Sequence, residues 1–299
     1  MSALLCLGEP LVEFVRLDNG DYRRGFGGDT SNAAIAAARQ GAEVGYITAL
    51  GTDRFGDGLI DLWAREDVST AHVRRDPEAP TGIYFVDPDP AGRFFTYYRA
   101  GSAASRMRPE DLPMDAVQAA RCLHLSGITL AVSDELRETA LAAMTAAREA
   151  GAEVSLDTNL RLKLWDLDTA QQVTRAAMRL ATIAVTSIDD SLHLTGLEAP
   201  AAIAEMYHAL GPATVLVTMG AEGCYLSHPG GAEQIPAAPA DPIDSTGAGD
   251  SFAGSYLAWW LETGDAALAA RRAAQVAAKT VSGLGAVDPI PTRAALGLG

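Results

Sequence analysis

Short apolar runs alternate with longer segments of helical periodicity along most of the chain. The runs with the length and composition of buried strands are residues 3–8, 44–50, 121–125, 153–157, 182–186 and 213–218. The segments with helical spacing are residues 30–40, 54–66, 134–150, 168–180, 200–209 and 249–261. Strands that alternate with helices of this length are typical of βαβ units. The pattern therefore predicts an α/β fold, with a mostly parallel central sheet covered by helices on both faces.

Two regions, 9–26 and 80–99, break this rhythm and contain strand-like segments such as 81–86 and 93–98. The sequence Asp-Pro-Asp-Pro-Ala-Gly at 87–92 is a strong turn signal between the two segments. We expect antiparallel strands that stand off the main sheet and form a small β lid, which would exclude water from a site beneath it. An ordinary surface hairpin is the alternative interpretation.

Composition narrows the class of protein. The chain has 299 residues, of which 48% are hydrophobic, enough for one large α/β domain or for a core domain with a small subdomain. The net charge of −15 argues against nucleic acid as a partner, because no basic field attracts phosphate backbones. The three cysteines, Cys6, Cys122 and Cys224, stand far apart with no His at ligand spacing, so neither a disulfide framework nor a metal site is expected. Because no signal peptide and no membrane span is found in the sequence, we expect a cytoplasmic protein without membrane contact.

The strongest chemical signal is Asp-Ser-Thr-Gly-Ala-Gly-Asp at 244–250, which joins a coil to a predicted helix. Gly247 and Gly249 leave room for a ligand, and the amides of a first helical turn are unsatisfied donors at the positive end of the helix dipole. Such a cradle suits a transferring phosphoryl group, and Asp250 beside it can accept a proton from an attacking hydroxyl. The segment is neither a Walker loop nor a Rossmann fingerprint, since Phe252 stands in place of the third glycine. A simple helix N-cap is the alternative.

A second signal, Gly-Gly-Asp-Thr-Ser-Asn at 27–32, lies at the start of the first predicted helix. Gly27 and Gly28 allow close approach of the backbone to a ligand. Asp29 and Asn32 offer carboxylate and amide groups that can bind sugar hydroxyls. A glycine turn into a capped helix explains the segment equally well.

Phenols and cations form a third group: Tyr84, Tyr97, Tyr98, Arg99 and Arg161. Arg161 follows a predicted strand, and a site at the carboxyl ends of parallel strands gathers such loops. Two arginines that face one site imply an anionic ligand, because Arg binds carboxylate or phosphate in a bidentate manner. Taken singly, each is more typical of a surface arginine.

Two further turns contain glycines. Val-Thr-Met-Gly-Ala-Glu-Gly at 217–223 indicates a strand, a turn and a second strand. It is either a bare β-turn or a flat edge where a nucleotide lies against the backbone. Gly-Leu-Gly-Ala at 283–286, after the last helix, could close a nucleotide pocket, but this signal is weak by itself.

Together these segments resemble the ribokinase-like (PfkB) carbohydrate kinase family, along essentially the whole chain. The resemblance implies a single three-layer α/β/α domain over 1–299, with a β-sheet lid formed by about 9–26 and 80–103. It implies Asp250 as the general base and the amides of Gly247, Ala248 and Gly249 as the anion hole. It also implies ATP and Mg²⁺ as cofactors, with the metal held mostly by phosphates and water. The residues implied in nucleotide binding are Asn159, Arg161, Thr218, Gly220, Gly223, Gly247 and Gly249.

A narrower resemblance, to the 2-keto-3-deoxygluconate kinases, rests on several short sequences. These are Gly-Glu-Pro-Leu-Val at 8–12, Arg-Gly-Phe-Gly-Gly-Asp-Thr at 24–30, Tyr-Tyr-Arg-Ala-Gly-Ser-Ala at 97–103, His-Leu-Ser-Gly-Ile at 124–128 and Asp-Thr-Asn-Leu-Arg at 157–161. The resemblance implies that a sugar acid lies between the glycine loop, the lid tyrosines and the two arginines. The implied substrate-binding residues are Gly27, Gly28, Asn32, Tyr84, Tyr97, Arg99, Arg161 and Asp250.

Some positions depart from the pattern of these kinases. Thr218 and Met219 replace a Lys-containing pair before the glycine turn, which affects the expected phosphate contacts. Leu160 stands where Tyr is common, so a stacking contact is lost. Glu13 occupies the place of an Asp that binds hydroxyls in kinases of neutral sugars, and its role stays open.

Three functions are compatible with the sequence. The first is an ATP-dependent 2-keto-3-deoxygluconate kinase, and the second is a related kinase of fructose, ribose or another deoxy sugar acid. The third is a catalytically silent sugar-binding or regulatory protein, against which Asp250 and the intact Gly-Ala-Gly argue. The resemblance also allows a monovalent cation near Asp244 and Thr246, and exposed lid strands favour a homo-oligomer.

Overall fold

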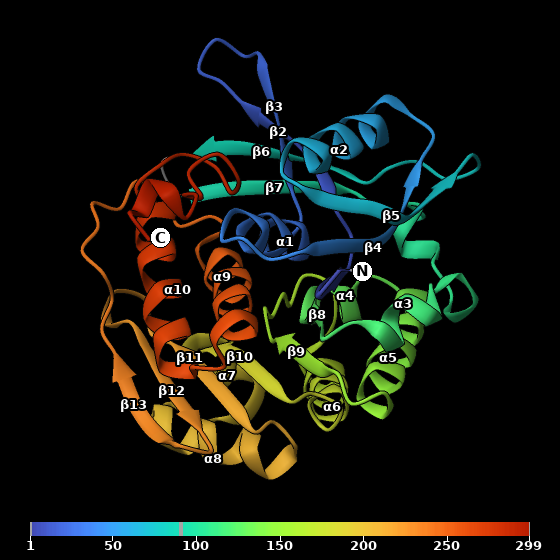
Figure 1. The fold of residues 1–299 in the computed structure, drawn as a ribbon. Helices are drawn as coiled ribbons and strands as arrows, with labels where there is room; N and C mark the ends of the chain where they lie inside the picture. Colours follow the sequence, from blue (N-terminus) through green and yellow to red (C-terminus); the bar gives the residue numbers. More distant parts are fainter. Residues whose placement is uncertain (1, 90–91, 299) are drawn as a thin grey trace.

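The computed structural model describes residues 2–89 and 92–298. It contains two separate β-sheets (Figure 1). The main sheet has nine strands in the order β13-β12-β11-β10-β9-β8-β1-β4-β5. Its strands are β1 (Leu4–Leu7), β4 (Val44–Gly51), β5 (Val68–Asp76), β8 (Cys122–Ser126), β9 (Glu153–Asp157), β10 (Ile183–Ser187), β11 (Thr214–Thr218), β12 (Cys224–His228) and β13 (Gly231–Ile235). All neighbours from β11 to β5 pair in parallel, whereas β12 and β13 are antiparallel. The predicted, mostly parallel central sheet is confirmed.

Apolar side chains cover both faces of this sheet. In β1, Leu4 and Cys6 belong to one buried cluster, whereas Leu5 and Leu7 belong to the other. Successive side chains of a strand point to opposite faces, so a strand buried on both sides must be apolar throughout. This explains why the central strands are visible in the sequence as continuous apolar runs.

Helices form a layer on each face of the main sheet (Figure 1). One layer consists of α1 (Asp29–Arg39), α2 (Arg54–Arg65), α9 (Ala248–Thr263) and α10 (Ala266–Thr280). The other consists of α3 (Met114–Ala119), α4 (Gly127–Ala131), α5 (Asp134–Glu149), α6 (Leu167–Met178), α7 (Ile188–Thr195) and α8 (Pro200–Leu210). Short 3₁₀ turns are η1 (Ala104–Arg106), η2 (Pro109–Asp111), η3 (Gly220–Glu222) and η4 (Ala294–Leu296). The three-layer α/β/α architecture is therefore confirmed.

The apolar pattern does not reveal the outer strands β5 and β13. Both lie at the edges of the main sheet, and most of their residues are exposed or half-buried. An edge strand buries little of its surface, so it needs no continuous apolar run. The pattern identifies the central strands because they are buried on both faces, and it misses β5 and β13 because they are not.

The small sheet consists of β2 (Leu11–Arg16), β3 (Tyr22–Gly27), β6 (Ile83–Asp89) and β7 (Gly92–Tyr98), in the order β3-β2-β6-β7. In Figure 1 it stands apart from the main sheet, and the β2–β3 hairpin projects from the molecule. The pairs β2–β3 and β6–β7 are antiparallel, but β2 and β6 are parallel.

The expectation of purely antiparallel strands is thus wrong at the centre of the small sheet. Strands β2 and β6 each begin shortly after the chain leaves the main sheet, and both run outwards from it. The turn predicted at 87–92 includes residues 90 and 91, which lie outside the described residues.

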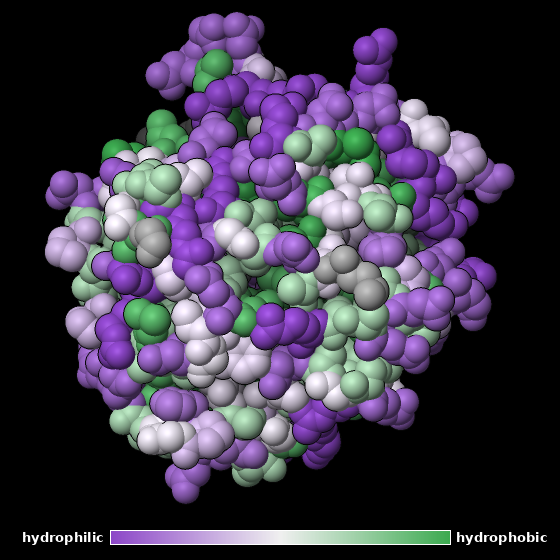
Figure 2. Space-filling model, viewed as in Figure 1, coloured by the Kyte–Doolittle hydropathy of each residue, from purple (hydrophilic) through white to green (hydrophobic). Residues whose placement is uncertain are grey.

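The surface is largely polar. Figure 2 shows hydrophilic residues over most of one face, with hydrophobic residues in small separate groups. Within 2–89 and 92–298, no helix has both the length and the apolar character that a membrane span requires.

Helices α1 and α9 approach each other backbone to backbone. A Cβ atom added at Gly254 of α9 would lie only 2.0 Å from the carbonyl oxygen of Ala33 in α1. A glycine is therefore required at this crossing. The contact places the first turn of α1 beside the first turn of α9.

We predict that Gly254→Ala lowers the free energy of unfolding by about 1–3 kcal/mol, because the added methyl overpacks a backbone contact. Urea denaturation measures the change. Gly249→Ala in the same helix is the matched control, because a Cβ there would have no heavy atom within 4 Å. Equal stability of the two variants would contradict the prediction.

Candidate active site

A cavity of about 940 Å³ lies between the carboxyl ends of the central strands and the small sheet. A crevice at this end of a parallel sheet is where α/β folds bind their ligands. Its lining residues at or just beyond strand ends include Glu9, Asp157, Ser187 and Thr218, and those from the small sheet are Leu11, Tyr84, Phe95 and Tyr97. The first turn of α9 completes the wall.

Asp250 lies in the first turn of α9, and its carboxylate lines this cavity. Its Oδ2 accepts a hydrogen bond of 2.8 Å from Nδ2 of Asn32 in α1. Burial, followed by repulsion from Asp29, raises the pKa of Asp250 to about 7. The hydrogen bond from Asn32 and the charge of Arg161 act in the opposite direction. A carboxylate with a pKa near neutrality is well suited to take up a proton.

The backbone before Asp250 forms an open turn. Gly247 has a φ of 78°, in the left-handed region that favours glycine, and caps α9. A Cβ at Gly249 would meet no heavy atom within 4 Å, so this position faces open space. The amide of Ala248 donates to the carbonyl of Ser245 at 3.2 Å. Within the described part of the chain, the unengaged donors of this turn are thus the amides of Gly247, Gly249 and Asp250, which suit an anion.

The glycine loop at the start of α1 reaches the cavity through Gly28 and Asp29. Gly28 has a φ of 106°, and a Cβ there would lie 2.8 Å from the carbonyl oxygen of Glu9. Oδ2 of Asp29 accepts a 2.8 Å hydrogen bond from Nδ2 of Asn159. Asn159 itself has a φ of 30°, a conformation unusual for a residue other than glycine. These contacts connect the loop after β9 to the start of α1.

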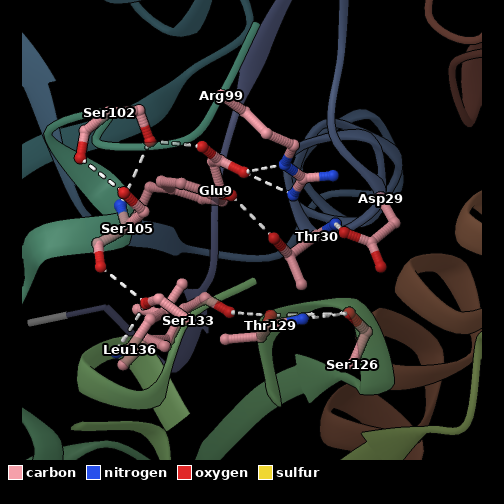
Figure 3. A network of polar contacts seen from close by, with 12 residues as sticks. Glu9, Asp29, Thr30, Arg99, Ser102, Ser105, Ser126, Thr129, Ser133 and Leu136 are labelled. Carbon is pink, nitrogen blue, oxygen red and sulfur yellow. Dashed lines mark hydrogen bonds and ion pairs between the residues drawn. The ribbon is translucent and has the colours of Figure 1, made fainter. Parts of the chain in front are cut away.

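The two arginines expected to face a ligand differ in their surroundings. Nε of Arg99 donates to Oε2 of Glu9 at 2.6 Å, and Nη2 forms an ion pair with the same carboxylate (Figure 3). Arg161 donates only to the carbonyl of Leu160, at 2.8 Å, and forms no ion pair within 2–89 and 92–298. Of the two predicted arginines, Arg161 is therefore the one without an ion pair. Lys163, which also lines the cavity, forms no ion pair within the described residues either.

Two tyrosines of the small sheet, Tyr84 and Tyr97, stack on each other. The rings of Tyr84 and Tyr97 lie 5.5 Å apart at 25°. The hydroxyl of Tyr84 donates to Oε2 of Glu13 at 2.6 Å. Burial and the adjacent Glu13 carboxylate raise the pKa of Tyr84 well above its usual range. Glu13, whose role the sequence left open, thus fixes the orientation of a cavity-lining tyrosine.

The structure brings most of the predicted site residues to one cavity. Those that line it are Gly28, Tyr84, Tyr97, Arg99, Asn159, Arg161, Thr218, Gly247, Gly249 and Asp250. Asn32 lies behind Asp250, and Gly27 lies behind Tyr84, whose hydroxyl would be 2.5 Å from an added Cβ. The nucleotide-binding roles predicted for Gly220 and Gly223 stay predictions. Gly223 packs against the backbone at the end of β13, where an added Cβ would lie 2.0 Å from the carbonyl oxygen of Ile235.

Sequence reasoning missed several acidic residues of the cavity. Glu9, Asp157 and Asp190 line its wall. Burial, with repulsion from Asp250 and Asp190, raises the pKa of Asp157 well above its usual range. Oδ2 of Asp190 accepts from Oγ1 of Thr158 at 2.8 Å and from the amide of Leu160 at 3.0 Å. Their position at or near the end of a strand is the signal that could have identified them.

The cavity combines a proton acceptor, an anion cradle and two cationic side chains, Arg161 and Lys163, that form no ion pair within the described residues. In the part of the chain that is described, no group of three or more His, Cys, Asp or Glu side chains could hold a metal ion. The unengaged amides of the turn before Asp250 fit phosphate oxygens, which would leave Mg²⁺ to be held mostly by phosphates and water. The arrangement is of the class used for phosphoryl transfer to a hydroxyl.

Comparison with known proteins identifies the family. The sequence profile of the pfkB family carbohydrate kinases matches residues 1–293. The chain is also 34% identical over 303 residues to a 2-dehydro-3-deoxygluconokinase of Thermoproteus tenax, with 98% of this chain and 92% of that protein covered. The chain therefore belongs to the pfkB family and is a sugar kinase.

Two further relatives are named for different sugar substrates. The 2-dehydro-3-deoxygluconokinase of Escherichia coli K12 is 34% identical over 297 residues, covering 95% of this chain and 96% of that protein. A fructokinase of Klebsiella pneumoniae is 33% identical over 255 residues, covering 84% and 82%.

Solved structures have the same fold along the whole chain. A PfkB protein from Polaromonas sp. JS666 superposes with a TM-score of 0.91 at 30% identity and covers 100% of both chains. A fructokinase from Xylella fastidiosa with bound ATP gives a TM-score of 0.89 at 26% identity, covering 99% of this chain and 97% of that one. The ribokinase-like fold is thereby confirmed.

We predict that kcat rises with pH through about pH 7, because Asp250 must lose its proton before it can accept one. Asp29→Asn removes a repulsive charge, so this limb of the pH–rate profile should move to lower pH. Asp57→Asn, at an exposed side chain paired with Arg75, is the control and should leave the limb in place. An unchanged profile in Asp29→Asn would contradict the assignment.

Proposed function

We propose that this chain is an ATP-dependent 2-keto-3-deoxygluconate kinase, which forms 2-keto-3-deoxy-6-phosphogluconate, an Entner–Doudoroff intermediate. The observation that carries the proposal is the half-buried Asp250 carboxylate beside the unengaged amides of Gly247 and Gly249, in a cavity that also holds Arg161. The 2-dehydro-3-deoxygluconokinases among the relatives support the same substrate.

In this proposal Asp250 accepts the proton of the attacking sugar hydroxyl. The amides of Gly247 and Gly249, at the positive end of the α9 dipole, stabilise the charge on the transferred phosphoryl group. Asn159 and Thr218 would contact the nucleotide, and Arg161 would lie between the nucleotide and the sugar, where it can contact both. Mg²⁺, when bound with ATP, neutralises phosphate charge.

The sugar carboxylate would be bound mainly by Arg161, which forms no ion pair in the described part of the chain. Arg99 would add one hydrogen-bond donor, because Glu9 already compensates most of its charge. Tyr84, Tyr97 and the backbone of Gly28 would enclose the carbon chain. This division of roles differs from an acid bound symmetrically by two arginines.

A kinase of fructose, ribose or another deoxy sugar acid is the second candidate. It is favoured by the fructokinase at 33% identity, a value close to that of the deoxygluconokinases. A panel of sugars and sugar acids in a coupled assay of ADP release distinguishes the two candidates.

Several accompanying features belong to the same proposal. Oδ1 of Asp244 accepts from the amide and hydroxyl of Thr246, and Oδ2 accepts from the amide of Gly285. This loop is where the family resemblance puts a monovalent cation. The exposed Tyr22, Phe94 and Tyr98 of the small sheet would favour a homo-oligomer, and we propose a cytoplasmic enzyme.

We predict that Asp250→Asn lowers kcat by about 10²- to 10⁴-fold, the usual loss for a well-placed base. ADP release with saturating sugar acid measures it. Asp265→Asn is the matched control, because Asp265 caps the next helix, α10, and lies outside the cavity. An unaltered rate in Asp250→Asn would remove Asp250 from the role of general base and point to a different base.

We predict that Arg161→Ala raises KM for 2-keto-3-deoxygluconate by about 10- to 100-fold, the cost of losing a hydrogen bond between charged groups. KM for fructose should change far less. Arg121→Ala is the control, because Arg121 also donates to a single backbone carbonyl, that of Leu261, away from the cavity. Equal effects on both substrates would overturn the assignment to a sugar acid.

A further inference from the structure

Glu9 lies where the two sheets are joined. It follows β1, the strand between β4 and β8 in the main sheet, and it directly precedes the chain segment that becomes β2. Its side chain is fully buried. Such a carboxylate requires a specific partner, because an unpaired buried charge is very costly.

The partners of Glu9 lie in the segment that follows β7, where the chain leaves the small sheet. Arg99, directly after β7, binds Oε2 through Nε and Nη2, and the hydroxyl of Ser102 donates to Oε1 at 2.5 Å (Figure 3). Gly82, directly before β6, lies against the same group, with an added Cβ only 3.0 Å from Oε1. The segments that lead into β2 and β6 and the segment that follows β7 thus meet at one carboxylate.

This contact determines the direction of the Arg99 side chain. With Nε and Nη2 on Glu9, the third nitrogen, Nη1, points away from Glu9 in Figure 3. Both residues line the cavity, and the guanidinium carbon of Arg99 lies 5.5 Å from the ring centroid of Tyr97. Without Glu9, a long arginine side chain just beyond the end of an edge strand would have many rotamers.

We propose that Glu9 is a positioning residue for substrate recognition: it anchors Arg99 to the main sheet and presents Nη1 to the ligand. The proposal rests on the kinase function above and deepens it. Glu9 acts through Arg99 rather than by contact with the sugar. Its contribution therefore depends on the geometry of the carboxylate and on the presence of Arg99.

Two substitutions separate geometry from charge. Glu9→Gln removes the charge but keeps the shape, since its amide oxygen can accept from Arg99 while its NH₂ group donates to the hydroxyl of Ser102. Glu9→Asp keeps the charge but withdraws the carboxylate by one methylene. For a positioning residue, Glu9→Asp should raise KM for the sugar acid by about 5- to 10-fold, and Glu9→Gln should stay within about 3-fold of wild type.

A double-mutant cycle tests the dependence on Arg99. Arg99→Ala should raise KM for the sugar acid by about 10-fold or more, and Glu9→Asp should add nothing in that background. KM for ATP serves as the internal reference and should stay unchanged in all these variants. Glu66→Asp is the matched control, because Glu66 forms a comparable pair with Arg39, with contacts of 2.7 Å, at the far end of α1.

The outcomes distinguish this proposal from the proposed function. A wild-type enzyme that does not turn over the sugar acid overturns the function, and the cycle is then run with the substrate that the panel identifies. If Arg99→Ala raises KM but Glu9→Asp does not, Glu9 is not a positioning residue. A lower KM in Glu9→Gln would show that charge, not geometry, is its contribution. If Glu9→Asp does not fold, Ser102→Ala, which removes the second hydrogen bond to Glu9, should still raise KM by about 3-fold, and no change would overturn the proposal.

Discussion

The structure depends on the close crossing of α1 and α9, where glycine allows one backbone to contact the other. Through this crossing Asn32 reaches Asp250, although the two residues are 218 positions apart in the sequence. The hydrogen bond unites the two glycine motifs in one wall of the cavity. Neither motif alone would place an acid, an anion cradle and a second glycine loop around one cavity.

The same crossing explains the electrostatics of the site. Several carboxylates lie around one cavity, and each makes it harder for its neighbours to ionise. Hydrogen bonds from Asn32 and Asn159 partly compensate this repulsion. The balance keeps the pKa of Asp250 near neutrality, the range in which a carboxylate can both accept and release a proton.

How far the sequence predicts the structure depends on the kind of information that each feature requires. Local signals suffice for the central strands, whose two buried faces demand apolar runs, and for the turns before α1 and α9. The parallel pairing of β2 with β6 was missed because it is set by how the chain leaves the main sheet. The partners of Arg99 and Tyr84 were missed for a related reason: residue type reveals a charge or a phenol, but not the carboxylate that lies beside it in the fold.

The pairing of Arg99 with Glu9 changes how the cavity can select an anion. Two free arginines would attract any anionic ligand, including a sugar phosphate, mainly through charge. One free arginine and one oriented donor instead require a carboxylate at a defined position, because a fixed donor contributes only when the acceptor meets it. In an acidic protein with a net charge of −15, long-range attraction of anions is weak, so recognition must come from such short-range geometry. Selectivity for a sugar acid would therefore depend as much on the buried Glu9 as on the arginines themselves.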